Sequence, residues 1–461
     1  MLNLDDLRER VKKGEINQVV ISFPDMYGRL MGKRYDADFF LESTVDDGAY
    51  CSTYLLACDM NMQQEPGYIF ANKSEEFGDF HLVPDWTSLR LMSWQNKTAT
   101  VMCDIHDNRK SDYVLVSHAP RSILRKQIEA ASKLPYKIFS ASELEYYAYE
   151  NSYYDARTQH YEKSKLKPLG DYPGNYHLLQ TARAEKYTEA FRHHLKASGI
   201  PVENSKGEDG IGQHELNIKF SDILSMADRH AIFKQCLKEV ADQLGASVTF
   251  MAKPFSDTAG NGCHIHLSIV NVSDGKNAFI TDGNGTDSNE NLSSSFKHFL
   301  AGWLKYVPDV MVFYAPTINS YKRFMSGIVA PTHLSWSHDD RTAAFRIVGK
   351  GQSIRIECRL PGADCNIYLA FAAILASGLR GIADQLELPP IFEGDICQAK
   401  ELPLVPQTLK EAIHAFENST FVREAFGEDV VNHYLNFFRL EQAAYETNVT
   451  DWERHRYFEQ I

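Results

Sequence analysis

The sequence lacks any run of about eighteen consecutive apolar residues, the length that a helix needs to cross a bilayer. Its first stretch, residues 1–13, is charged and amphipathic, without the apolar centre that signal peptides have. We therefore expect a protein that works in the cytoplasm and has no contact with membranes.

An excess of basic residues is also missing. The chain carries 48 Lys and Arg against 61 Asp and Glu, which gives a net charge of −13. Binding to the phosphates of nucleic acids requires a basic face. This balance therefore argues against nucleic acid as a partner.

Paired cysteine motifs are absent. The eight cysteines are scattered without CxxC spacing, and several of them lie in apolar, strand-like runs. Buried, reduced thiols are the simplest explanation of this pattern. A GxxxxGK[ST] loop for nucleotide phosphates is missing as well.

The composition that remains is typical of a large globular protein, with 44% hydrophobic residues in a chain of 461. Such a chain is too long for one hydrophobic core. Short strands are indicated before residue 110, at 19–23, 89–91 and 98–103. After it, a helix begins near Pro120, and helices at 188–198, 226–244 and 296–307 alternate with strands. We predict an α+β fold with an N-terminal domain at 1–110 and a catalytic domain at 111–461.

Four strand-like segments place unusual polar residues on one face, because side chains at i and i+2 of a strand point the same way. The segments span residues 142–146, 213–218, 263–268 and 354–360. Their polar faces hold Glu143, Glu145, Gln213, Glu215, Asn217, His264, His266, Ser268, Arg355, Glu357 and Arg359. For any single strand, a solvent-exposed face is the commoner explanation. Four faces rich in glutamate, histidine and arginine predict an enclosed active site.

The chemistry of these residues favours hard divalent cations. Carboxylates with one imidazole per site suit Mg²⁺ or Mn²⁺, whereas zinc sites favour cysteine and several histidines. Standing alone, His264 would more often be a core histidine than a ligand. Two metal ions flanked by arginines fit phosphoryl transfer, because guanidinium groups stabilise the developing negative charge.

The sequence resembles the glutamine synthetase family, type I-like, over nearly its whole length. The motifs that carry the resemblance are SELEYY (142–147), GEDGIGQHE (207–215), GNGCHIHLS (260–268), NSYKRF (319–324), APTHLSW (330–336), DDRTAAFRI (339–347) and RIECRLPGADCNIYL (355–369). The resemblance implies a small β-grasp domain followed by a large catalytic α/β domain. It also implies a homo-oligomer, commonly a dodecamer of two stacked hexameric rings, with active sites between neighbouring subunits.

The resemblance further implies roles for individual residues. Glu145, Glu208 and Glu215 match the ligands of one metal ion, and Glu143, His264 and Glu357 match those of the other. His266, Ser268, Arg341, Arg346 and Arg355 match positions that bind ATP. Gly260, Arg323 and Arg359 match positions that bind glutamate, and Arg323, Arg341 and Arg359 match catalytic arginines.

Two acidic residues that glutamine synthetases use for ammonia differ in this chain. Val329 replaces a glutamate that precedes the Ala-Pro pair, and Ser52 aligns with an aspartate of the small domain, although Asp46 and Asp47 are close by. Losing both acids removes the site for a small cation, so we expect ammonia to be a poor substrate.

These departures resemble the branch of the family that joins glutamate to polyamines, ethanolamine, alkylamines or arylamines. We predict ATP-dependent ligation of the γ-carboxyl group of glutamate to an organic amine in amine breakdown. Val329 slightly favours a monoamine, including an arylamine such as aniline. The alternatives are a polyamine or ethanolamine ligase, a glutamine synthetase that uses ammonia, and an inactive ring with a structural or regulatory role.

Overall fold

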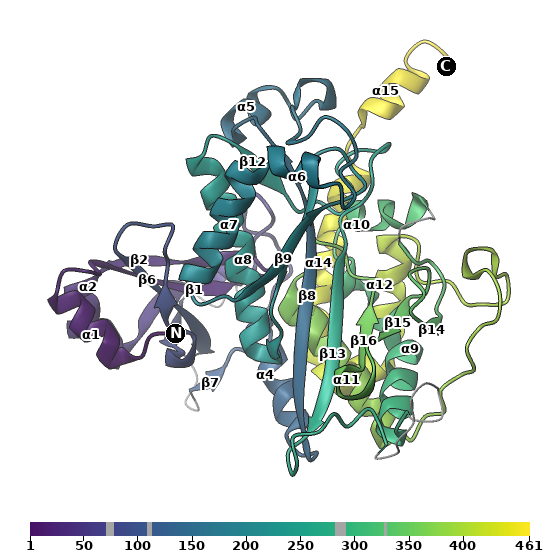
Figure 1. Cartoon of the computed structure of the whole chain (residues 1–461), viewed down its shortest axis with the longest axis horizontal. Coiled ribbons are helices and arrows are strands. Elements are labelled where there is room, and N and C mark those ends of the chain that lie inside the picture. Colours follow the sequence, from purple (N-terminus) through teal and green to yellow (C-terminus); the bar gives the residue numbers. More distant parts are fainter. Residues whose placement is uncertain (71–77, 108–112, 282–291, 327–329) are drawn as a thin grey trace.

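The computed structural model describes residues 1–70, 78–107, 113–281, 292–326 and 330–461. It contains two mixed sheets with helices packed on both (Figure 1). The strands of the first lie between residues 18 and 115, and those of the second between residues 136 and 358. The α+β fold class is confirmed. The predicted domain boundary near residue 110 lies outside the described residues and stays a prediction.

The first sheet belongs to the N-terminal part, drawn in purple in Figure 1. Its strands run in the order β2-β1-β6-β4-β3, and both β5 and β7 pair with β6. Their bounds are β1 (Gln18–Pro24), β2 (Leu30–Asp36), β3 (Ala49–Ser52), β4 (Asp79–Pro84), β5 (Arg90–Leu91), β6 (Thr98–Asp107) and β7 (Val114–Leu115). Helix α1 (Leu4–Lys12) buries Leu7 in a separate hydrophobic cluster with Val19, Ile21 and Val101 of this sheet.

The second sheet forms the centre of the larger part, where the long strands β8 and β13 stand side by side (Figure 1). Its strands run in the order β14-β15-β16-β13-β8-β10-β9, and β11 and β12 pair with β8. Their bounds are β8 (Tyr136–Tyr149), β9 (Val202–Gly207), β10 (Gln213–Ile218), β11 (Ser221–Asp222), β12 (Ser247–Thr249), β13 (Cys263–Asn271), β14 (Trp336–His338), β15 (Phe345–Val348) and β16 (Arg355–Cys358). All four segments predicted to carry polar faces are strands of this one sheet.

Long helices pack around the second sheet and form the main hydrophobic core. They are α4 (Pro120–Ala131), α7 (Glu185–Ala197), α8 (Ile223–Gln243), α9 (Ser294–Tyr314), α11 (Ile367–Ala383), α12 (Leu409–Asn418) and α14 (Glu428–Glu446). The shorter α13 (Thr420–Phe426) joins this core, whereas α15 (Asp451–Tyr457) has no buried residue and lies outside it. Shorter helices are α2 (Ala37–Phe39), α3 (Val45–Asp47), α5 (Tyr153–Thr158), α6 (Leu178–Arg183) and α10 (Ile318–Lys322). Among the described residues, no helix is long and apolar enough to cross a membrane.

The helix predicted at 296–307 does not end there. Helix α9 continues through Pro308 to Tyr314, so that part of the prediction is wrong. A proline inside a helix costs about 3 kcal/mol, since it removes a backbone hydrogen bond. The residues from Val310 to Tyr314 are all buried in the core, and their packing outweighs that cost.

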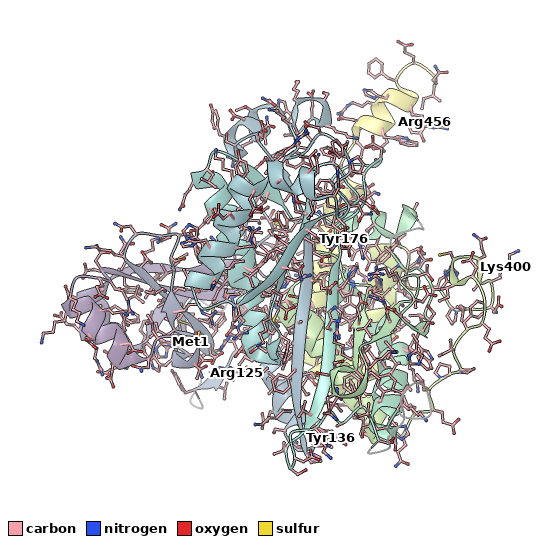
Figure 2. The ribbon with its side chains drawn as sticks, viewed as in Figure 1. Met1, Arg125, Tyr136, Tyr176, Lys400 and Arg456 are labelled. Atoms are coloured by element: carbon pink, nitrogen blue, oxygen red, sulfur yellow. The ribbon has the colours of Figure 1, made fainter. Side chains whose placement is uncertain are left out.

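A buried ionic network joins the two parts of the chain. Arg121, on α4, forms ion pairs with Asp85 and Asp104, which belong to the N-terminal part, and with Asp228 on α8 (3.0 Å). Arg125, labelled in Figure 2, pairs with the same two N-terminal aspartates at 2.6 and 2.8 Å. The network fixes α4 between the sheets.

The eight cysteines, which all lie in the described ranges, are free. Seven are buried, as the apolar runs around them predicted, and Cys397 is exposed. Burial raises the pKa of the Cys51 thiol to about 12. Such thiols are unreactive at neutral pH.

Candidate active site

Strand register brings the predicted polar faces together. Glu215 on β10 lies opposite Glu145 on β8, and His264 on β13 lies opposite Glu143 on β8. On the far side of β13, His266 lies opposite Glu357 on β16. Because cross-strand partners share a face, these residues form one polar surface across four strands.

The first acidic group consists of Glu145, Glu208 and Glu215, whose oxygens lie within 4.8 Å of one another. The Glu145 carboxylate accepts a hydrogen bond from the Gly262 backbone N–H at 2.6 Å, which fixes its direction. Burial raises the pKa of Glu215, and the negative charge of Glu143 adds to this effect. Three crowded carboxylates of this kind favour a cation between them.

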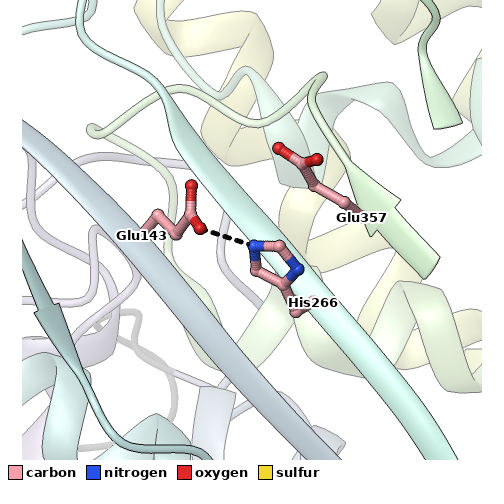
Figure 3. A group of neighbouring side chains, drawn as sticks. All are labelled: Glu143, His266 and Glu357. Carbon is pink, nitrogen blue, oxygen red and sulfur yellow. Dashed lines mark hydrogen bonds and ion pairs between the residues drawn. The ribbon is translucent and has the colours of Figure 1, made fainter. Parts of the chain in front are cut away.

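The second group consists of Glu143, His266 and Glu357, which Figure 3 shows converging from β8, β13 and β16. His264 belongs to the same neighbourhood, because its Nδ1 lies 3.3 Å from Glu143 Oε2 and 3.6 Å from Glu357 Oε1. Burial opposes ionisation of Glu143, but hydrogen bonds from His264 and His266 outweigh it and hold the pKa of this carboxyl well below its usual range. Glu143 is therefore a carboxylate at neutral pH.

The two histidines differ in their hydrogen bonds. Arg355 Nε donates to His266 Nδ1 at 3.2 Å, so the ring proton of His266 resides on Nε2. From there it points to Glu143 Oε1 at 2.8 Å. In this arrangement both nitrogens of His266 are engaged.

Arginines surround Glu357, which is almost fully buried. Arg359 Nη1 donates to Glu357 Oε1 at 2.6 Å, and Arg346 Nη1 donates to Oε2 at 3.0 Å. Burial opposes ionisation of Glu357, but the neighbouring His264 and Arg359 side chains hold its pKa below the ordinary value. Arg341 is exposed, and its backbone carbonyl accepts from Arg359 Nε at 3.0 Å.

Arg323 and Gly260 lie close together. The buried guanidinium of Arg323 donates to the Leu360 carbonyl at 2.9 Å. A Cβ atom at Gly260 would meet Arg323 Cγ and the Ala252 carbonyl oxygen, each at 2.8 Å. Only glycine therefore fits at this position without a local shift.

A cavity of about 470 Å³ opens beside the second group. Glu143, His266, Ser268 and Arg355 line it together with the aromatic rings of Phe139 and Phe220. The volume lies in the range typical of small-molecule sites. The cavity thus holds three of the residues that the resemblance connects with ATP.

Of the two residues predicted for the amine pocket, Ser52 is not brought to this surface. Ser52 ends β3 of the N-terminal sheet, where it pairs with Asp79. Val329 lies outside the described residues.

Lys206 is a site residue that the sequence analysis missed. It lies on β9 directly opposite Glu215, and its ammonium group contacts both Glu208 and Glu215. Its position two residues before Glu208 could have indicated that it lies near the acidic group. The polar run of β9, however, has no alternation of polar and apolar residues that would identify a strand face.

The chain is similar to known proteins over nearly its whole length. The family model for the glutamine synthetase catalytic domain matches residues 117–457. The chain is 41% identical to gamma-glutamylethanolamide synthetase GlnA4 of Streptomyces coelicolor, over all of this chain and 96% of that protein. It is 33% identical to glutamate–isopropylamine ligase of a Pseudomonas species, over 99% of this chain and 98% of that protein.

The same relation appears among solved structures. The structure "Apo GmaS without ligand" superposes with a TM-score of 0.83 at 27% identity, over 100% of both chains. Together with the match of the family model over most of the chain, this shows that the protein belongs to the glutamine synthetase family, as an ATP-dependent carbon–nitrogen ligase.

Proposed function

We propose that this protein joins the γ-carboxyl group of glutamate to an organic amine through a γ-glutamyl phosphate intermediate. The observation that carries the proposal is the single polar surface that presents two carboxylate groups, Arg346 and Arg359 beside a cavity of about 470 Å³. Carboxylates and guanidinium groups in this arrangement fit a reaction that brings two anions, glutamate and a nucleotide, together.

A carboxylate is a poor electrophile, so it must first be activated. The γ-carboxylate of glutamate takes the terminal phosphoryl group of ATP, which yields an acyl phosphate and ADP. The amine nitrogen then attacks the acyl carbon, inorganic phosphate leaves, and the amine loses one proton. Binding the reactants in one enclosed site lowers the entropic cost of both steps and limits hydrolysis of the intermediate.

Two divalent ions, Mg²⁺ or Mn²⁺, fit the two groups. Glu145, Glu208 and Glu215 would hold one ion, and Glu143, Glu357 and His264 the other. His264 is the better candidate than His266, because Arg355 and Glu143 occupy both nitrogens of His266. When bound, the ions neutralise phosphate charge.

ATP is proposed to occupy the cavity lined by His266, Ser268 and Arg355, with Arg346 and Arg341 at its phosphates. For glutamate we propose the region around Gly260, where Arg323 and Arg359 are buried and positively charged. The close approach that Gly260 permits would let the backbone contact the substrate directly.

For the amine we propose a small monoamine, with ethanolamine as the first candidate. The relatives described above are named for ethanolamide formation and for isopropylamine. Both are aliphatic monoamines, which agrees with the loss of acidic groups at Ser52 and Val329. An arylamine such as aniline stays a proposal with less support.

A cytoplasmic homo-oligomer is proposed as the working form, on the resemblance a dodecamer of two hexameric rings. The C-terminal helix α15 extends away from the body (Figure 1), and Arg456 in Figure 2 marks its position. Trp452, Phe458 and Ile461 are 62%, 84% and 96% exposed there. Exposed apolar side chains of this kind favour burial against another subunit. On the resemblance, the active sites would then lie between neighbouring subunits.

The test is phosphate release from ATP with glutamate and Mg²⁺ across ammonium, ethanolamine, putrescine, spermidine, isopropylamine and aniline, with mass spectrometry of each product. Release with ethanolamine or isopropylamine and little with ammonium is the expected result. Strong release with ammonium would identify a glutamine synthetase instead. Silence with every amine would favour an inactive ring.

A further inference from the structure

Lys206 lies inside the first acidic group. Its Nζ forms an ion pair with Glu208 Oε1 and lies 3.3 Å from Glu215 Oε2. The side chain is 19% exposed, and those of Glu208 and Glu215 are 15% and 5% exposed. The ammonium group thus contacts two of the three carboxylates of this group.

Two further contacts hold Lys206 in place. Its Cα lies opposite that of Glu215 in the β9–β10 pairing, so both side chains point to the same face. The Tyr176 ring lies 4.7 Å from Nζ, within reach of a cation–π interaction. Tyr176, labelled in Figure 2, is tied to β9 by its backbone N–H, which donates to the Gly207 carbonyl at 3.2 Å.

We propose that Lys206 is the resident cation of the Glu145, Glu208 and Glu215 group, and that a divalent ion must displace its ammonium to bind there. The inference rests on the proposed function, because it takes this group as a metal site. Displacement separates one ammonium from two partly buried carboxylates, which weakens metal binding. The second group has no lysine among its contacts in the described residues. Arg346 and Arg359 contact Glu357, and Arg355 contacts His266.

A chain built in this way has two unequal metal sites. The group with Lys206 binds its ion more weakly than a lysine-free group of three carboxylates would. Lys206 therefore lowers the affinity of this group for its ion.

The experiment measures Mn²⁺ binding by electron paramagnetic resonance, without nucleotide or substrate. The variants are Lys206→Met, Lys206→Arg and Lys167→Met. Methionine keeps much of the length of the lysine and loses the charge, whereas arginine keeps the charge beside the same carboxylates. Lys167, exposed and paired with Glu150, is the control for loss of a lysine elsewhere.

We expect the Kd of one class of Mn²⁺ sites to fall by about tenfold in Lys206→Met and to change by less than about twofold in the other two variants. Mn²⁺ should also raise the Tm of Lys206→Met more than that of the wild type, because tighter binding stabilises the folded state further. A purely structural role of Lys206 would lower Tm without tightening Mn²⁺ binding.

An unchanged or higher Kd for Mn²⁺ in folded Lys206→Met would overturn the role of Lys206. If the wild type still formed the amide, the proposed function would be unaffected by that result. Failure of the wild type to bind any Mn²⁺ would overturn both this inference and the proposed metal centre.

Discussion

Replacing Arg121 by methionine should destabilise the protein strongly, because three aspartates share this buried guanidinium. Asp85 and Asp104 keep Arg125 at 2.6 and 2.8 Å. Asp228, whose side chain is 4% exposed, keeps one hydrogen bond from a described side chain, that of the Tyr368 hydroxyl at 2.7 Å. A buried charge left without its partner costs about 3–5 kcal/mol.

We expect the lower end of that range, about 3 kcal/mol for Arg121→Met, since only Asp228 loses its direct cation. Arg90 is near enough to attract Asp228, although its Nε donates to the Ser88 carbonyl instead. Arg125→Met is the matched control. Arg125 is 31% exposed and both of its aspartates retain Arg121, so its loss should cost about 1 kcal/mol.

The assay is urea unfolding followed by circular dichroism, with all variants at one protein concentration because subunit association contributes to stability. Adding Asp228→Asn to Arg121→Met should recover about half of the loss, since the uncompensated charge disappears. Equal losses in the two single variants, or no recovery in the double variant, would refute this explanation of the network.

Three further outcomes are expected. Gly260→Ala should lower kcat/KM for glutamate by about tenfold or more and also lower Tm, because the new Cβ would press on Arg323 and on the Ala252 carbonyl oxygen; steady-state kinetics and calorimetry would detect the two effects. Chelation of divalent ions should lower Tm, and Mg²⁺ or Mn²⁺ should restore it in calorimetry. Burial, aided by the neighbouring His118, keeps the pKa of His433 well below its usual range. As the pH falls, His433 is therefore protonated in the unfolded chain before it is protonated in the folded protein. The contribution of His433 to the free energy of unfolding is therefore complete above the unfolded pKa of about 6.5 and is lost as the pH falls below it. His433→Gln should reduce the slope of the free energy of unfolding against pH in that range by about 1.4 kcal/mol per pH unit, as measured by urea unfolding at several pH values.

The sequence predicted which segments of the site are strands better than it predicted which of their residues lie together. Alternation of polar and apolar residues identified β8, β10, β13 and β16, because each strand has one buried and one polar face. Alternation carries no information on register between segments far apart in the chain. That His266 lies opposite Glu357 therefore became known only from the β13–β16 pairing.

Helices followed the same logic. Amphipathic spacing located α7 and α8, whose ends differ from the prediction by a few residues. Helix α11 was not predicted, because it is apolar on nearly all sides and thus lacks the periodicity that marks a surface helix. Lys206 was missed for a related reason, since β9 has no apolar side chain after Val202 and so shows no alternation.

The central claim is that glutamate is activated as an acyl phosphate before the amine attacks. Glutamate labelled with ¹⁸O in its γ-carboxyl group tests it directly in a reaction with ATP, Mg²⁺ and ethanolamine. Mass spectrometry of the inorganic phosphate should find one ¹⁸O atom per phosphate, in step with amide formation. Amide formed with unlabelled phosphate would contradict the claim.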